Sequence, residues 1–220
     1  GLIAGIAFTM KNLNPNVKIY GVQAAGAPSM LRSITDGEME ELDDVSTIAD
    51  GIAVKKPGDL TFSLCQQYVD EIVTVSDDEI SAAILALMEQ QKLVTEGAGA
   101  VSVAAVMFNK IPVKGKKVAC LLSGGNVDVT ILSRVIERGL VMSGRRCQFI
   151  IELMDKPGQL LGVAEIVAKL GGNVTSVFHE HAGEGADVNG CYLRIDLETR
   201  NFEHIAAIRK ALEEAGFRIR

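Results

Sequence analysis

The chain has 220 residues, of which 48% are hydrophobic, and a formal net charge of -6 at pH 7. This length can bury one large or two small hydrophobic cores. The negative charge and the absence of a concentrated basic patch argue against a nucleic-acid partner. No apolar run approaches the roughly 20 residues that span a bilayer, which argues against a membrane partner.

Residues 1–142 are predicted to form an α/β domain. Apolar residues recur at helical spacing over residues 3–13, Asn14-Pro15-Asn16 ends that helix, and residues 17–23 form the next strand. Strands alternate with helices from there on, which indicates parallel strands joined by right-handed crossovers. The remaining predicted elements are helices at 29–34, 59–69, 77–91, 98–109 and 128–139, strands at 71–75 and 117–122, and an irregular segment at 46–58.

A second domain is predicted at residues 146–220, after a short polar linker at Ser143-Gly144-Arg145. Its expected elements are a strand at 147–154, a helix at 159–170, a strand at 173–181, a turn around Gly183, a strand at 189–198, a helix at 202–215 and a terminal strand at 217–220. This βαββαβ order predicts a ferredoxin-like domain, with an antiparallel four-stranded sheet and two helices on one face.

The four cysteines, Cys65, Cys120, Cys147 and Cys191, are far apart and show no CxxC spacing. We therefore expect buried thiols in a reducing compartment, with the cytoplasm as the default location.

Three segments of the first domain could contact a ligand. Residues 1–5 (GLIAG) open a helix, whose free N–H groups suit a phosphate, although many helices begin with glycine for packing reasons. Ser123 and Gly124 stand where a strand is expected to end and a helix to begin, the place where open α/β sheets bind ligands; a tight turn with an N-cap is the alternative. Glu96 precedes a helix of small residues, where it could instead stabilise the helix dipole.

Four motifs together carry a resemblance to a known family. Residues 1–5 (GLIAG), 46–54 (STIADGIAV), 96–100 (EGAGA) and 123–128 (SGGNVD) occur in the order found in threonine and serine dehydratases. These are pyridoxal-phosphate-dependent enzymes of the tryptophan-synthase-β-like class, or fold type II. The resemblance covers nearly all of residues 1–140 and implies β-elimination of L-threonine to 2-oxobutanoate and ammonia, a step of isoleucine biosynthesis.

The resemblance also assigns cofactor-binding residues. It implies that Gly1 and Leu2 bind the phosphate of pyridoxal phosphate, that the Ser123 hydroxyl hydrogen-bonds the pyridine nitrogen, and that the glycine turn and Ser123 meet opposite ends of one ring. The other implied cofactor-binding residues are Gly51, Glu96 and Gly124.

This chain lacks two groups that related enzymes carry, a Schiff-base lysine and metal-binding carboxylates. The family's Schiff-base lysine lies upstream of the glycine loop, and no lysine of this chain stands in a matching motif. We therefore expect a fragment that contains no catalytic residue and is inactive alone. Where related racemases carry metal-binding carboxylates, this chain has Gln23, Ala27 and Ser29, so no metal site is expected.

The second domain resembles the ACT domain, a regulatory module that senses amino acids. The resemblance rests on residues 155–161 (DKPGQLL) and 171–174 (GGNV). In that family effectors bind between paired domains, at the loop before the first helix and the start of the second strand. The implied effector-binding residues are Asp155, Gly158, Gln159, Leu160 and Asn173. A homo-oligomer is expected, because such sheets commonly pair and an unpaired terminal strand leaves a bare edge.

The histidines are predicted to be structural or solvated. His179 and His181 fall on one strand face, a spacing that can bind metal, but the sequence offers no third ligand, and His204 is expected on a helix surface.

Three alternatives stay open at this point. A serine dehydratase or racemase shares the motifs at Glu96 and Ser123. A non-catalytic amino-acid sensor would consist of these two domains. A dinucleotide-binding domain is disfavoured, because no complete GxGxxG follows a first strand.

Overall fold

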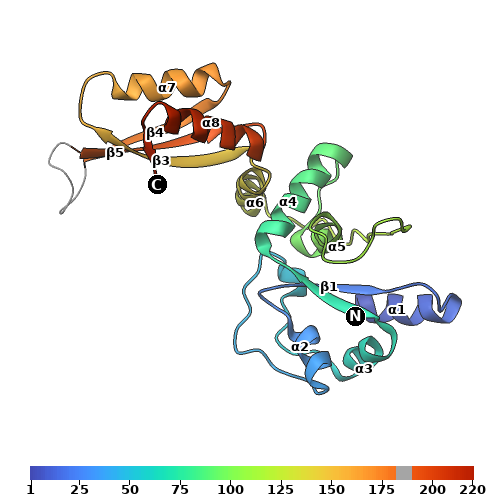
Figure 1. Ribbon diagram of the computed structural model, residues 1–220. Coiled ribbons are helices and arrows are strands. Elements are labelled where there is room, and N and C mark those ends of the chain that lie inside the picture. Colours follow the sequence, from blue (N-terminus) through green and yellow to red (C-terminus); the bar gives the residue numbers. More distant parts are fainter. Residues whose placement is uncertain (182–189) are drawn as a thin grey trace. The chain divides into compact units, whose positions relative to one another are not determined.

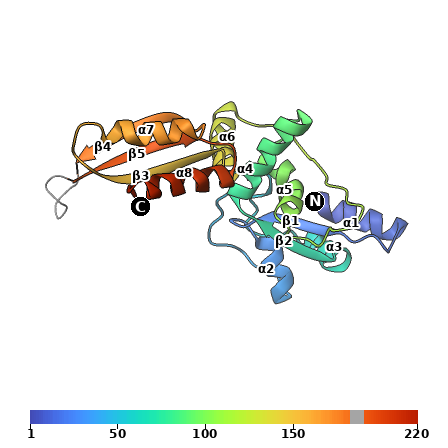
Figure 2. The same cartoon turned by 45° about the horizontal axis from the view of Figure 1, so that its top comes forward.

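Strands β1 (Tyr20–Ala24) and β2 (Glu71–Val75) pair in parallel, with Tyr20 opposite Glu71 and Ala24 opposite Val75. Helix α5 (Gly97–Met107) packs against both strands, and helix α4 (Asp77–Ala86) packs against α5 (Figures 1 and 2). The core between them is built from small and branched residues. Its fully buried members include Ala24, Val75, Ile80, Ile84, Ala100 and Ala104.

The computed structural model describes residues 1–181 and 190–220 and divides them into two compact units, Gly1–Gly139 and Leu140–Arg220. The turn predicted around Gly183 lies outside the described residues. Among the described residues, no helix combines the length and the apolar character needed to cross a membrane.

The helices of the first unit follow the predicted order closely. Ser76 and Glu79 close a capping box at the start of α4, which fixes its first residue. After Ala86 this helix continues as one wider turn, η2, and Lys92 then ends it in a left-handed conformation. The remaining helices are α1 (Leu2–Leu13), α2 (Ser29–Asp36), the single turn η1 (Asp50–Ile52), α3 (Asp59–Tyr68), η2 (Leu87–Gln91) and α6 (Val129–Met142).

The strand predicted at residues 117–122 is wrong. This segment has no regular secondary structure, and Val118, Leu121 and Leu122 are exposed. Residues 118–120 and β1 both line a groove of about 640 Å³. Among the described residues, the segment pairs with no strand. Cys120 is exposed for the same reason, contrary to the prediction of a buried thiol.

The second unit contains the elements β3, α7, β4, β5, α8 and β6 in the predicted order. All neighbouring strands are antiparallel, and the sheet order is β4-β5-β3-β6. The bounds are β3 (Arg146–Met154), α7 (Gln159–Lys169), β4 (Asn173–His181), β5 (Gly190–Glu198), α8 (Phe202–Glu214) and β6 (Arg218–Ile219).

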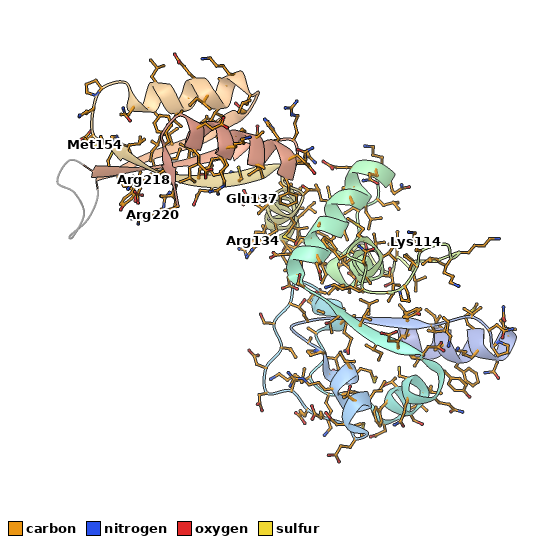
Figure 3. All side chains as sticks on the ribbon, viewed as in Figure 1. Lys114, Arg134, Glu137, Met154, Arg218 and Arg220 are labelled. Carbon is orange, nitrogen blue, oxygen red and sulfur yellow. The ribbon has the colours of Figure 1, made fainter. Side chains whose placement is uncertain are left out.

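Alternation along the strands places the core of the second unit on one face of this sheet. Every second residue of β5, from Cys191 to Leu197, is buried, and these side chains pack with Val167 of α7 and with Ile208 of α8. The opposite face carries Glu152, whose carboxylate accepts a hydrogen bond from Arg220 Nε at 2.6 Å. Figure 3 labels Arg218 and Arg220 on this terminal segment.

His204 is buried, at 6% exposure, rather than on the surface of its helix. Its Nδ1 accepts a hydrogen bond from the Arg200 N–H at 3.1 Å, and its Nε2 lies 3.0 Å from the Leu170 carbonyl. Because Nδ1 accepts, Nε2 carries the proton and donates. The ring thus joins the start of α8 to the end of α7, a tertiary role that helical periodicity cannot reveal.

Asp70 joins three segments of the first unit. Its carboxylate lies 2.7 Å from Lys11 Nζ and 2.8 Å from Lys18 Nζ, and it accepts a hydrogen bond from the Ile19 N–H at 2.8 Å. Partial burial alone would raise the pKa of Asp70, but the Ile19 hydrogen bond and the two ammonium groups outweigh burial and hold that pKa well below its usual range. The ionised carboxylate therefore stabilises the folded unit.

We expect Asp70→Asn to lower the free energy of unfolding of the first unit by about 2 kcal/mol at pH 7, since three charge-assisted contacts are weakened. Because the folded pKa lies below the unfolded value of about 3.9, this stabilisation is complete above about pH 5 and is lost as the pH falls through both values. Denaturant titrations from pH 7 to pH 2 measure the difference in unfolding free energy between the variant and wild type. That difference should narrow only below about pH 4. The neighbouring exposed residue supplies the control, Glu71→Gln, which should change stability little at any pH.

Candidate active site

The loop at residues 46–54 is fixed at the start of α4. The Thr47 hydroxyl donates to Asp77 Oδ1 at 2.6 Å, and the Ile48 N–H donates to Asp77 Oδ2 at 3.2 Å. At its beginning, the Ser46 N–H donates to the Gly26 carbonyl at 3.1 Å, just beyond the carboxyl end of β1. The loop therefore lies at the edge of the parallel sheet where α/β folds bind ligands.

Helix α5 begins against this loop. A Cβ atom on Gly97 would lie 2.8 Å from the Ile48 carbonyl oxygen and 2.9 Å from Ala49 Cα, so only glycine permits the approach. Glu96 is the N-cap residue of α5, but its side chain makes no capping hydrogen bond. Its carboxylate instead lies toward Gly51, where an added Cβ would be 3.5 Å from Oε1. Glu96 therefore does not cap α5 through a side-chain hydrogen bond.

Residues 123–125 close the other side of this carboxylate. The Thr95 hydroxyl donates to the Gly124 carbonyl at 2.9 Å, and the Glu96 N–H approaches the same oxygen at 3.4 Å. Gly124 has φ +88°, and a Cβ there would lie 2.3 Å from Glu96 Oε1. A Cβ on Gly99 would likewise lie 2.5 Å from the Ser123 carbonyl oxygen.

The structure thus brings together four of the six residues to which sequence analysis assigned cofactor contacts: Gly51, Glu96, Ser123 and Gly124. They share a surface made largely of backbone and glycine, which a flat ring can approach closely. Half-buried Ser123 is positioned on this surface by the backbone around Gly99. A carboxylate acceptor and a hydroxyl donor beside a glycine-lined backbone fit a pyridine ring with polar substituents.

Gly1 and Leu2 are placed elsewhere. Gly1 is the N-cap of α1, and both residues line a shallow hollow of about 520 Å³ with Gly5, Ile6, Thr9 and Met10. Within the described ranges, no contact joins this hollow to Glu96 or Ser123. The expectation that the glycine turn and Ser123 meet one ring is therefore not supported by a direct contact in this chain.

Two residues near the site have structural partners. Asp128 accepts hydrogen bonds from the Thr130 hydroxyl and N–H, both at 2.7 Å, and these bonds lower the pKa of Asp128 and cap the start of α6. Gln23, which replaces a family carboxylate, donates to the Ala27 carbonyl at 3.2 Å and accepts from the Leu31 N–H at 2.8 Å. Both side chains organise backbone.

Several lysines of the first unit are engaged away from the site. Lys110 pairs with Glu79 at 2.8 Å, Lys55 donates to the Asp43 carbonyl at 2.8 Å, and Lys11 and Lys18 pair with Asp70. In the part of the chain that the structure describes, no lysine contacts Glu96 or Gly124.

In the second unit, four of the five residues to which sequence analysis assigned effector contacts line one hollow. Asp155, Gly158, Gln159 and Leu160 surround about 360 Å³ at the start of α7, together with His179 and Cys191, which sequence analysis did not connect to this place. Asn173 lies at the opposite end of β4 and donates a hydrogen bond to Glu198 Oε2 at 2.8 Å. One copy of the chain does not bring Asn173 to the hollow.

Comparisons with known proteins place the chain in context. The family described as "Pyridoxal-phosphate dependent enzyme" matches residues 1–124. An L-threonine ammonia-lyase of Thermotoga maritima is 49% identical over all 220 residues, which cover 55% of that protein. The chain spans about half the length of the curated relatives it matches.

Two solved structures resemble the chain. A processed form of threonine deaminase isoform 2 from Solanum lycopersicum gives a TM-score of 0.57 at 39% identity, over 62% of this chain and 38% of that one. Maize serine racemase gives a TM-score of 0.56 at 31% identity, over 64% of this chain and 44% of that one.

Gly124→Ala should destabilise the first unit by about 2–4 kcal/mol, because the left-handed backbone is strained by a Cβ and that Cβ overlaps the Glu96 carboxylate. Gly115→Ala is the matched control: Gly115 has φ +74° and open space around it, so it should lose only about 1 kcal/mol. Denaturant unfolding measures both. In a Glu96→Ala background the two losses should become similar, and an unchanged difference would contradict the overlap.

Proposed function

The chain belongs to the family of pyridoxal-phosphate-dependent enzymes, and on that basis we propose that its first unit supplies part of the cofactor site of a threonine ammonia-lyase. The whole protein would convert L-threonine to 2-oxobutanoate and ammonia by β-elimination. The likeness to the Thermotoga maritima L-threonine ammonia-lyase over the whole of this chain supports threonine as the substrate.

The observation that carries this proposal is the convergence of Gly51, Glu96 and Gly124. A Cβ on Gly124 would enter the Glu96 carboxylate, and one on Gly51 would lie 3.5 Å from it, so three segments distant in sequence meet around one carboxylate. A carboxylate held among glycine backbone can accept a hydrogen bond from a polar ring placed beside it. Pyridoxal phosphate would bind there and supply an electron sink to the substrate.

Each residue then has a distinct task. Ser123 donates its hydroxyl proton to a hydrogen bond with the ring nitrogen, and because a hydroxyl is neutral it need not keep that nitrogen protonated. The Glu96 carboxylate accepts a hydrogen bond from the polar edge of the ring. Gly124 has no side chain, so its backbone can lie directly beneath the ring. Gly1 and Leu2 offer backbone N–H groups at the start of α1 to the phosphate.

The lysine that holds the cofactor covalently would belong to the part of the protein outside these residues. Lys11, Lys18, Lys55 and Lys110 have partners elsewhere, and the chain covers only 55% of the related ammonia-lyase. We infer that the first unit orients and shields the cofactor but does not itself bond to it. The four free thiols of the whole chain agree with a cytoplasmic location.

For the second unit we propose an ACT-like regulatory module that binds an amino-acid effector. Its support is the hollow lined by Asp155, Gly158 and Gln159, where a carboxylate can take an ammonium group and the start of α7 can take a carboxylate. A strand rises about 3.3 Å per residue, so Asn173 lies roughly 20 Å along β4 from His179. Asn173 could therefore contact the same effector only from a second copy, which favours a homo-oligomer.

A serine-specific relative is the second candidate. Maize serine racemase matches the chain almost as well in structure as the tomato threonine deaminase does. The two enzymes differ in substrate and product, so assays of the whole protein with L-threonine and L-serine separate them.

In the whole protein, Ser123→Ala should lower kcat/KM for L-threonine by about tenfold to a hundredfold, since one hydrogen bond to the ring is lost. The exposed Ser133→Ala on α6 is the control and should retain wild-type kinetics. The assay measures 2-oxobutanoate and ammonia, with L-serine in parallel and D-serine formation as a test for racemisation. A Ser123→Ala enzyme equal to wild type, or D-serine as the main product, would refute the proposal.

Calorimetric titration of the 220-residue chain with isoleucine, valine, threonine and serine, in the presence of a chelator, tests the regulatory proposal. At least one amino acid should bind, and Asp155→Ala should weaken it by about tenfold because a charge-assisted contact is lost. Glu165→Ala, an exposed carboxylate on the far turns of α7, should bind as wild type does. Absence of binding by all four amino acids argues against an effector site.

A further inference from the structure

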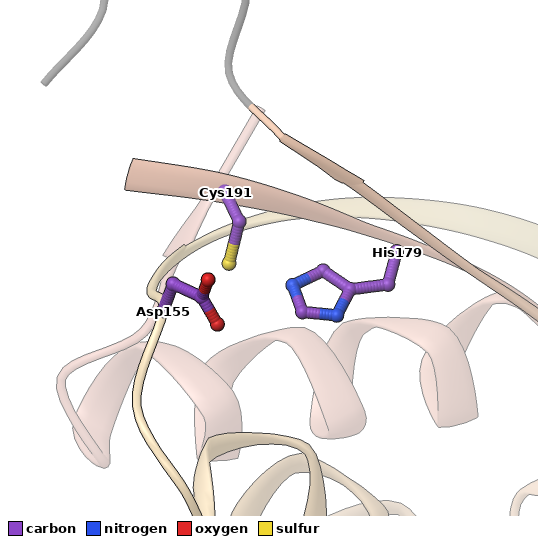
Figure 4. A group of neighbouring side chains, drawn as sticks. All are labelled: Asp155, His179 and Cys191. Carbon is purple, nitrogen blue, oxygen red and sulfur yellow. The ribbon is translucent and has the colours of Figure 1, made fainter. Parts of the chain in front are cut away.

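Three potential metal ligands from three separate segments meet at one end of the second unit. Asp155 follows β3, His179 lies on β4 and Cys191 begins β5 (Figure 4). One ligand atom from each side chain lies within 4.8 Å of the corresponding atoms of the other two. Sequence analysis found no third ligand near His179, because the other two residues lie 24 positions before it and 12 after it.

The register of the sheet produces this meeting. Cys191 is opposite Leu153, and His179 is opposite Leu193, one alternation farther along β5. Both Cys191 and Leu193 are buried on the helix-facing side, so His179 lies on that side as well. Asp155 enters from the loop that follows β3. The three groups therefore line the same hollow, while Cys191 is at its floor.

We propose that Asp155, His179 and Cys191 form a binding site for a divalent transition-metal ion, with zinc as the preferred ion. A thiolate, an imidazole and a carboxylate are the three protein ligand types that zinc takes, and a set of three leaves a fourth position open to solvent or to a small ligand. A hard ion such as Mg²⁺ is disfavoured by the sulfur and nitrogen donors.

The three ligand atoms already lie within 4.8 Å of one another, and two ligands of one zinc ion lie about 3–4 Å apart. Cys191 is buried, whereas Asp155 and His179 are exposed.

Binding balances charge and releases a proton. The Cys191 thiol donates a hydrogen bond to the Leu153 carbonyl at 3.5 Å. When the ion binds, the S–H proton leaves to solvent and a sulfur–metal bond forms, with no change of oxidation state. The thiolate and the carboxylate then neutralise the two positive charges.

This site goes beyond the proposed regulatory function, although both use Asp155. An ion bound here would tie the loop before α7 to β4 and β5, the same loop that is proposed to hold an effector. The ion does not require an effector, and His179 and Cys191 are not among the proposed effector-binding residues. Metal binding and amino-acid binding can therefore fail separately.

The test uses the chelator-treated 220-residue chain titrated with Co²⁺ alone and then with Zn²⁺. We expect one ion per chain, a thiolate-to-cobalt charge-transfer absorption, loss of that absorption when Zn²⁺ displaces cobalt, and release of one proton. Cys191→Ser should abolish the absorption, and Cys147→Ser, a half-buried cysteine at the other end of β3, should keep it.

His179→Gln guards against a folding artefact, because this exposed side chain can be changed without opening the core. It should weaken Zn²⁺ binding by at least about tenfold while the circular dichroism and the thermal midpoint of the metal-free chain stay unchanged. Persistence of the cobalt–thiolate absorption in Cys191→Ser, its absence in wild type, or unchanged affinity in His179→Gln overturns the site. Amino-acid titration of the same variants in chelator reports separately on effector binding.

Discussion

The first unit depends on backbone segments that approach one another more closely than any side chain would allow. The loop before η1 touches the start of α5 at Gly97, and the segment after position 122 touches Glu96 at Gly124. These contacts need glycine because a Cβ would overlap a carbonyl or a carboxylate. They also bring the Glu96 carboxylate against Gly124 and close to Gly51. A substitution at Gly97 or Gly124 would therefore disturb both the packing and the candidate site.

Local pattern was enough to predict most helices and strands. Periodicity and the Ser76 and Glu79 capping pair define α4, and alternation defines β3 to β5. The same reasoning failed where the structure of a segment depends on residues far away in the sequence. Residues 117–122 have a strand's composition but pair with no strand among the described residues, and His204 is buried where its ring bonds the Leu170 carbonyl at the end of another helix. An isolated segment carries no information about such partners.

The same distinction applies to the candidate sites: residues within a motif could be grouped from the sequence, but residues that meet through strand pairing could not. Motif order predicted that Gly51, Glu96 and Ser123 belong together; the Glu96 carboxylate lies beside Gly51 and Gly124, and the roles of these residues at a cofactor stay a prediction. The hollow at the start of α7 gathers Asp155 and Gly158 as the motif suggested. His179 and Cys191 could not be assigned to it beforehand, because their meeting depends on the pairing of β4 with β5 residue by residue. A shift of one residue would turn His179 to the opposite face of the sheet.

The groove between β1 and residues 118–120 has a practical consequence. One edge of β1 faces this groove, and Val118, Leu121 and Leu122 stand exposed beside it. Unsatisfied strand edges flanked by apolar side chains recruit extended peptide from any source. At high concentration, the edge of β1 that could accept a further strand would also join one molecule to the next. The purified chain should therefore be most prone to precipitation through this surface. Short apolar peptides that occupy the edge should act as solubilising additives.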